Sequence, residues 1–181
     1  MLTDLQSRKL THLFEVMDSN GDGQLEWSDF ERIADKIAGT KGLEPGSAGY
    51  DALMGQYRYG WQQAEPFVEG DDGMSVDAYL ASYDRILATP GVYDTLVRPS
   101  AEMIFDIFDM DGDEKVTVDE WREFFRCHSI EPSEADRCFE KYDLNEDGYV
   151  SRSELVDLVG QFYLSSDPDA PGNYLFGSYS A

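Results

Sequence analysis

The stretch "DSNGDGQLEWSD", residues 18–29, places oxygen-bearing side chains at every second position, with glycines between them. The pattern returns as "DMDGDEKVTVDE" at residues 109–120 and as "DLNEDGYVSRSE" at residues 143–154. A pattern that recurs along one chain indicates a repeated structural unit. Ca²⁺ takes about six to eight oxygen ligands, which a short loop supplies by alternating side chains with backbone carbonyls. The three stretches are therefore interpreted as loops that hold a hard cation.

Apolar residues flank each loop at helical spacing. The aromatic residues four positions before the loops are Phe14, Phe105 and Phe139, and the apolar residues at loop position eight are Leu25, Val116 and Val150. Further apolar residues follow each loop at a spacing of three, which is typical of one face of a helix. The sequence thus predicts a unit of helix, loop and helix whose two helices turn their apolar faces to the same side.

These residues resemble the EF-hand, whose loop binds calcium through positions 1, 3, 5, 7, 9 and 12. In that order and without position nine, the predicted ligands are Asp18, Asn20, Asp22, Gln24 and Asp29, then Asp109, Asp111, Asp113, Lys115 and Glu120, then Asp143, Asn145, Asp147, Tyr149 and Glu154. Position seven contributes only its backbone carbonyl. Position nine is Glu26, Thr117 or Ser151, which hold the ion directly or through a water. The resemblance implies three Ca²⁺ sites, with Mg²⁺ an option at the first, which closes on the shorter Asp29.

A fourth copy is expected because EF-hands pair, and three is an odd number. A helix with Ser47 as its N-cap is predicted from the apolar spacing that begins at Tyr50. The following stretch fits the loop frame from Glu69 to Leu80, with Gly73 at position five and Val76 as the apolar position eight. Leucine at position twelve cannot ligate calcium, so this second loop is predicted to be silent. The alternative is an irregular site formed by Asp71, Asp72 and Asp77.

The four units are expected to form two paired lobes of one compact, all-α protein. We predict an N-terminal pair at residues 1–90, a C-terminal pair at 91–164 and a tail at 165–181 that packs on the core. The joint between the pairs is placed at residues 88–100, with Pro90, Gly91 and Pro99 as helix breakers. Within the C-terminal pair, Ser133 followed by Asp136 is a predicted N-cap.

The order of active, silent, active and active loops resembles the sarcoplasmic calcium-binding protein and calerythrin group. The resemblance covers nearly the whole chain, including the tail "SSDPDAPGNYLFG" at residues 165–177. It implies a calcium and magnesium buffer, and Tyr174, Leu175 and Phe176 are expected to fill the apolar groove that a calcium sensor would expose. The departures from the group are Asp29, Glu114 where loop position six normally has glycine, and Tyr174 where the tail often carries tryptophan.

Composition restricts the partners. Lys and Arg number 14 against 37 Asp and Glu, which gives a formal net charge of −23, so nucleic acid and anionic membranes are repelled. Cys127 and Cys138 have neither the number nor the spacing of a disulfide framework or a zinc site. No long apolar run or secretory signal is found. We expect a soluble, cytoplasmic monomer with calcium ions as ligands and no obligate protein target.

Two other functional classes are considered. Related photoproteins depend on a histidine near the C-terminus, whereas this chain has only His12 and His128. Binding of a small, luciferin-type ligand stays open, because the tryptophans and tyrosines could line a cavity as well as form the core. A calcium-triggered sensor is the remaining alternative. Neither histidine stands beside a motif serine or cysteine, and the loops account for the carboxylate pairs, so we expect no enzyme.

Overall fold

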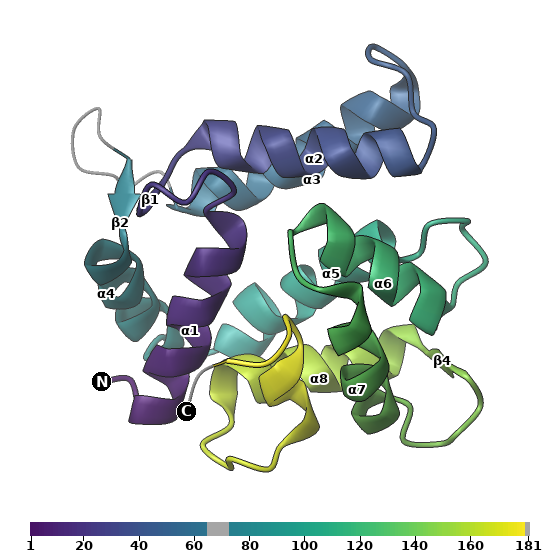
Figure 1. Ribbon diagram of the computed structural model, residues 1–181. Coiled ribbons are helices and arrows are strands. Elements are labelled where there is room, and N and C mark those ends of the chain that lie inside the picture. The colour runs from purple at the N-terminus through teal and green to yellow at the C-terminus, as the bar shows by residue number, and fades with distance from the viewer. Residues whose placement is uncertain (65–72, 180–181) are drawn as a thin grey trace.

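The computed structural model describes residues 1–64 and 73–179, and this part of the chain is mostly helical (Figure 1). Its α-helices are α1 (Asp4–Met17), α2 (Trp27–Thr40), α3 (Ala48–Ala64), α4 (Val76–Leu87), α5 (Arg98–Phe108), α6 (Val118–Cys127), α7 (Pro132–Tyr142) and α8 (Arg152–Leu164). The shorter elements are the π-helix η2 (Tyr93–Val97), the 3-10 helix η3 (Pro171–Tyr174), and the strands β1 (Gln24–Leu25), β2 (Met74–Ser75), β3 (Val116–Thr117) and β4 (Tyr149–Val150). The prediction of an all-α fold is confirmed.

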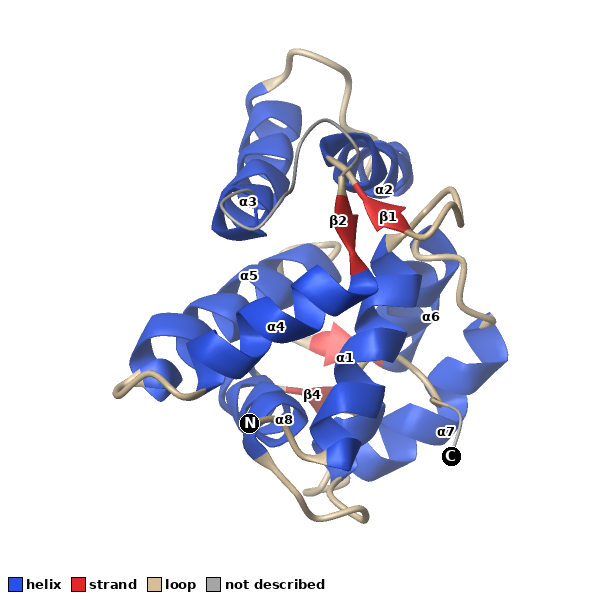
Figure 2. Cartoon of the chain, turned by 90° about the vertical axis from the view of Figure 1, so that its left-hand side faces the viewer, coloured by secondary structure: helices blue, strands red, loops and turns tan. Residues whose placement is uncertain are grey.

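The short strands join the helix-loop-helix units in pairs. β1 pairs with β2 and β3 with β4, both antiparallel, and Figure 2 shows the first pair between α2 and α4. In the second pair Val116 lies opposite Val150, so loop position eight of one unit meets position eight of the other. We call α1 to α4 the N-terminal half and η2 to α8 the C-terminal half; the exact domain bounds stay a prediction.

The strand register corrects the predicted frame of the second loop. Leu25, at position eight of the first loop, lies opposite Met74. Position eight is therefore Met74 and not Val76, which is the first residue of α4. The closing position moves from Leu80 to Ala78, which offers no side-chain oxygen either. Met74 and Val76 are both apolar and two residues apart, so an alternating pattern cannot distinguish them, whereas pairing with β1 does.

The approach of the two loops explains one glycine. Gly73 has φ +80°, and a Cβ at this residue would lie 3.0 Å from the carbonyl oxygen of Leu25. A larger residue would thus be strained and would also push β1 and β2 apart. Of the alternative irregular site, Asp71 and Asp72 lie outside the described residues, and Asp77 lies in the first turn of α4.

The helix starts follow the predictions in part. Ser47 does cap α3, because its hydroxyl accepts a hydrogen bond from the Tyr50 backbone N–H at 3.2 Å. The predicted cap at Ser133 is wrong: the N-cap residue of α7 is Glu131, two residues earlier, and the helix begins at Pro132. Proline is favoured at the first position of a helix, where a backbone N–H has no partner inside the helix.

Pro99 does not break a helix, contrary to the prediction. η2 runs directly into α5, and the backbone N–H of Arg98 bonds to the carbonyl of Tyr93, five residues back. A proline ring inside an α-helix clashes with the carbonyl four residues before it. Here the helix widens into a π-turn directly before Arg98 and Pro99, and the helical chain continues through the proline. The joint between the halves is accordingly shorter than predicted and lies at residues 88–92.

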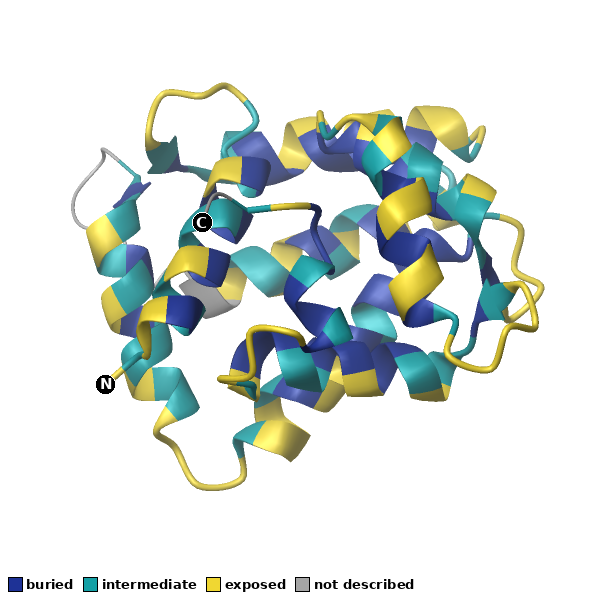
Figure 3. Ribbon diagram, turned by 60° about the horizontal axis from the view of Figure 1, so that its bottom comes forward, coloured by how far each residue is buried: buried dark blue, intermediate teal, exposed yellow. Residues whose placement is uncertain are grey.

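Aromatic side chains fill the interior. In the C-terminal half Trp121 packs between Phe108 and Tyr142, with ring centroids at 4.3 and 4.8 Å. The two halves meet through α1 with α8 and α2 with α6, and Tyr83 stacks on Tyr163 at 5.6 Å between centroids. Buried residues accordingly line the inner helix faces (Figure 3). Among the described residues no helix combines the length and the apolar character that a membrane crossing requires.

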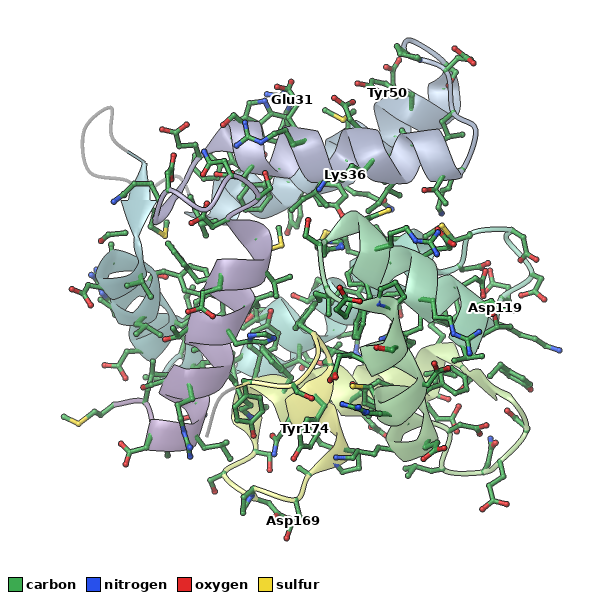
Figure 4. All side chains as sticks on the ribbon, viewed as in Figure 1. Glu31, Lys36, Tyr50, Asp119, Asp169 and Tyr174 are labelled. Carbon is green, nitrogen blue, oxygen red and sulfur yellow. The ribbon has the colours of Figure 1, made fainter. Side chains whose placement is uncertain are left out.

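The tail lies between the two halves. Leu175 is completely buried and Phe176 is 5% exposed. The Tyr142 hydroxyl donates a hydrogen bond to the carbonyl of Tyr174, and the His12 Nε2 lies 3.0 Å from the carbonyl oxygen of Phe176. Figure 4 shows Tyr174 near α8, in the lower part of the view. The tail thus contacts α1 from the N-terminal half and α7 and α8 from the C-terminal half.

A buried lysine anchors this arrangement. Lys9 on α1 has no exposed surface, and its Nζ donates to the carbonyls of Gln161 and Ser165, both at 3.1 Å, and to Asn173 Oδ1 at 2.9 Å. Burial lowers the pKa of Lys9 to about 8. The three oxygens satisfy the three donors of the ammonium group, which is what permits the charge inside the protein. One side chain therefore joins α1, the end of α8 and the tail.

Lys9→Met should lower the free energy of unfolding by about 1–3 kcal/mol, because three buried acceptors lose their donor. Urea denaturation in saturating calcium measures the change. Lys141→Met is the control, since Lys141 is exposed and only lies over the Tyr174 ring, 3.5 Å from its centroid. Equal stability of the Lys9→Met variant and the wild type would show that the buried ammonium is not an anchor.

Candidate metal sites

The carboxylate at position one of each loop organises the backbone around it. In the first loop, Asp18 Oδ1 accepts from the Gly21 N–H at 2.9 Å and Oδ2 from the Gly23 N–H at 2.8 Å. For Asp109 the donors at the same two loop positions are Gly112 (2.7 Å) and Glu114 (3.1 Å). For Asp143 they are Asp147, one position later in the loop (3.1 Å), and Gly148 (2.8 Å). In all three loops the carboxylate at position one therefore accepts from the backbone N–H at position six and from one other N–H within the loop.

The third loop, residues 109–120, brings three carboxylates together. Ligand oxygens of Asp109, Asp111 and Glu120 all lie within 4.8 Å of one another. Glu120 is held in place by the backbone N–H groups of Met110 and Thr117, each at 2.8 Å. Three oxygen donors without sulfur or imidazole suit Ca²⁺ or Mg²⁺ rather than zinc or copper. The residues present thus fit the cation that the sequence predicts.

The first and fourth loops differ from the third by an asparagine at position three. Asn20 Oδ1 accepts from the Asp22 N–H at 2.8 Å, and Asn145 Oδ1 from the Asp147 N–H at 2.9 Å. In the fourth loop, Glu154 Oε2 accepts from the Ser151 N–H at 2.8 Å. Within residues 1–64 and 73–179, no second group of three acidic, histidine or cysteine side chains converges as closely as that of the third loop. The ligand assignments in these two loops stay predictions.

The residues at position seven lie in or next to the short strands. Gln24 lies in β1 and Tyr149 in β4, and Lys115 directly precedes β3. The Lys115 Nζ lies 4.5 Å from the centroid of the Tyr149 ring. These two side chains contact each other, and the assignment of the position-seven carbonyls as ligands stays a prediction.

Asp29, which closes the first loop, is already engaged. It has no exposed surface, and its Oδ1 accepts from the Ser19 N–H at 3.1 Å, the Ser19 hydroxyl at 3.2 Å and the Arg32 Nη2 at 2.7 Å. Its Oδ2 accepts from the Glu26 N–H at 2.9 Å. An oxygen with three donors has no lone pair left for a metal. Asp29 is therefore restricted to one ligand oxygen, Oδ2, unless Arg32 moves away.

Glu114, at position six of the third loop, is strained but paired. Its φ is 65°, the left-handed region that favours glycine. Its carboxylate bonds Arg152 Nη2 at 3.0 Å, and Arg152 Nη1 bonds Glu102 at 2.7 Å and Asp106 at 2.9 Å. Arg152, the first residue of α8, thereby joins the third loop to the helix that leaves the fourth loop. Glu114 is exposed, so this ion pair offsets only part of the strain.

Three cations near the loops were not assigned from the sequence. Arg32 stands one helical turn after Asp29, a spacing that predicts an ion pair and could have been recognised. Arg152 and Lys41 reach the third loop from residues far away in the chain, and no local pattern indicates such contacts.

The chain is similar in sequence and in structure to known calcium-binding proteins. A model of the EF-hand domain pair matches residues 99–160, and an EF-hand model matches residues 10–34. Obelin of Obelia geniculata is 31% identical, over 90% of this chain and 85% of its own. Calerythrin of Saccharopolyspora erythraea is 24% identical, over 90% and 94%. The calcium-loaded coelenterazine-binding protein of Renilla muelleri is similar in structure, with a TM-score of 0.76 at 24% identity, over 98% of this chain and 99% of that one.

Asp29→Glu should raise the preference of the first site for calcium over magnesium. The longer side chain can offer both oxygens and so complete the shell that Ca²⁺ favours, whereas Mg²⁺ takes about six ligands at roughly 2.0–2.1 Å and gains nothing. Site-resolved titrations with both ions measure the ratio. Glu154→Asp is the matched control and should lower the ratio of the fourth site. An unchanged ratio in Asp29→Glu would show that Asp29 does not set the selectivity, and Glu26 at position nine would be the next residue to test.

Glu114→Gly should tighten calcium binding at the third site by a few-fold, because relief of about 1 kcal/mol of backbone strain exceeds the loss of an exposed ion pair. Glu114→Ala separates the two effects, since it keeps the strain and loses the ion pair, and should bind more weakly than the wild type. Calorimetric titration of both variants measures this. A large loss of affinity in Glu114→Gly would show that Glu114 itself serves the ion.

Proposed function

Because the chain belongs to the EF-hand family of calcium-binding proteins, we propose that it is an intracellular Ca²⁺ and Mg²⁺ buffer with three working loops. The second loop takes no ion in this account, since Ala78 at its closing position has no oxygen. The bound ions neutralise acidic side chains crowded into three short turns of a protein with a formal net charge of −23. No catalytic step and no obligate protein partner belong to the proposal, and the protein acts as a cytoplasmic monomer.

The buried tail is the observation that supports a buffer over a sensor. A sensor exposes an apolar groove when calcium binds, and a target helix then fills it. Here Phe176 packs against Phe162 with ring centroids at 5.1 Å, and Leu175 has no exposed surface. Burial of a leucine or phenylalanine side chain is worth about 1.5–3 kcal/mol. A target would have to displace both side chains, so the tail competes with any target for the same apolar surface.

A second candidate function is the binding of a small organic ligand. A cavity of about 280 Å³ lies between the halves, lined by His12, Ile33, Lys36 and His128 among others. Burial lowers the pKa of His128 to about 4, so its ring is neutral at physiological pH, and Nδ1 lies 2.9 Å from the carbonyl oxygen of Phe124. The lining is partly apolar but also carries the charged Glu15, Asp18 and Lys36, so it suits an organic molecule that brings polar groups of its own. Saturable quenching of tryptophan fluorescence by coelenterazine, the ligand named for the Renilla muelleri neighbour, would support this candidate.

Calorimetric titration combined with a hydrophobic dye tests the buffer proposal directly. Three calcium ions should bind per chain, and dye fluorescence should stay at the level of the calcium-free protein. Magnesium should compete most strongly at the first site, because Asp29 offers only one ligand oxygen, and this costs calcium a ligand but not magnesium. A large gain in dye fluorescence on calcium addition would favour the sensor, and the absence of calcium binding would refute both.

Deletion of residues 171–181 should raise dye binding several-fold in the calcium-loaded form, because the surface under Leu175 and Phe176 becomes accessible. The matched control is Tyr179→Ala in the full-length chain, which removes the stacking on Tyr174, with centroids at 5.7 Å, and leaves the buried pair in place. If the truncated protein binds no more dye than the full-length chain, the tail does not cover an apolar surface in the calcium-loaded form.

A further inference from the structure

The end of α2 reaches across to the start of the third loop. Lys41, the C-cap residue of α2, donates from Nζ to the carbonyl oxygens of Asp106 at 3.0 Å and Asp109 at 2.9 Å. These carbonyls belong to the last turn of α5, where backbone acceptors have no partner inside the helix. A cation is also favourable at that end of the helix dipole. A lysine of the N-terminal half thus caps a helix of the C-terminal half.

The same ammonium group lies in the field of the third loop. Burial lowers the pKa of Lys41, and the negative charges of Asp109, Glu120 and Asp106 oppose that shift. Asp109 and Glu120 belong to the three carboxylates that converge in this loop. The positive charge of Lys41 therefore acts on the carboxylates that the resemblance assigns to calcium.

Two arginines near Glu120 form ion pairs with carboxylates outside the converging group. Arg122 and Arg126 line the hollow beside Glu120, but Arg122 pairs with Asp119, and Arg126 with Glu123 at 2.6 Å. Each of these arginines is three residues from its partner on α6, and Arg122 also pairs with Asp136 of α7. Lys41 differs because its electrostatic partners include Asp109 and Glu120, two of the three converging carboxylates. Arg152 also reaches the third loop, but through Glu114, which is not one of the three.

α2 connects two loops physically. Its first turn contains Asp29, which closes the first loop, and its last residue is followed by Lys41 at the third loop. A helix of this kind is a stiff element, so the position of Lys41 depends on how the N-terminal half is placed. Lys36, on the same helix, also reaches the C-terminal half, but its Nζ donates to the Ser129 hydroxyl at 3.3 Å, away from the third loop (Figure 4).

We propose that Lys41 sets the calcium affinity of the third site from the opposite half of the molecule. Its charge partly neutralises the empty loop and opposes a divalent cation among Asp109, Asp111 and Glu120. By reciprocity, occupation of the third site weakens the attraction that holds Lys41 there, so the site and the contact between the halves are coupled. The inference rests on the proposed calcium-binding function and names a regulation of one of its sites.

Lys41→Met tests the inference, because methionine keeps the apolar stem and removes the charge. A calcium titration of the full-length ¹⁵N-labelled protein, with a chelator of known affinity as competitor, follows the amide signals of each loop separately. The third site should bind about three- to tenfold more tightly than in the wild type at low salt, and the difference should shrink at high salt. Lys41→Arg keeps the charge and should stay near the wild type, and Lys36→Met should leave the third site unchanged.

A second measurement uses the unaltered chain. The ¹³Cε signal of Lys41 should shift when the third site fills and should not shift at that calcium level in Glu120→Gln. An unchanged third site in Lys41→Met, an equal change at all three sites, or a Lys41 signal indifferent to calcium would overturn the inference. Failure of the wild type to bind calcium at residues 109–120 would instead refute the proposed function.

Discussion

The rest of this structure depends on one electrostatic constraint, which is that several carboxylates are held close together within one short loop. Asp109, Asp111 and Glu120 converge within 4.8 Å in a chain whose formal net charge is already −23. Like charges at such distances repel one another strongly unless protons or cations compensate them. The backbone N–H groups that surround each position-one carboxylate supply part of the compensation, and a divalent cation would supply the rest. Repulsion between these carboxylates therefore lowers the stability of the ion-free protein, and a bound divalent cation restores it.

The basic side chains show how the fold manages the same charge without an ion. Only 14 Lys and Arg are available, and several of them stand beside the loops: Arg32 on Asp29, Arg152 on Glu114 and Lys41 at Asp109. Arg32 joins the first loop to the helix that follows it, whereas Arg152 and Lys41 join the third loop to α8 and to the end of α2. The cations thus serve both electrostatics and architecture, which is why the three sites should not behave as identical copies of one motif.

The sequence predicts the repeated units well because their determinants are local. Alternating oxygens, the apolar position eight and the flanking aromatics all lie within about two helical turns of each loop. The second loop shows the limit: Met74 and Val76 fit the pattern equally, and only pairing with Leu25 decides between them. Pro99 shows another, since the π-turn directly before it has no local signature. Long-range contacts such as Lys9 with Asn173 and Lys41 with Asp109 depend on packing that no short stretch encodes.

Thermal unfolding with and without calcium tests the central claim most directly, because ions that bind only the folded chain stabilise it by mass action. Calorimetry should be run in excess calcium, in excess magnesium and in chelator, at the same ionic strength. Calcium should raise the unfolding temperature by more than about 10 °C over chelator, since three sites each contribute a few kcal/mol. A midpoint that is the same in calcium and in chelator would contradict that claim.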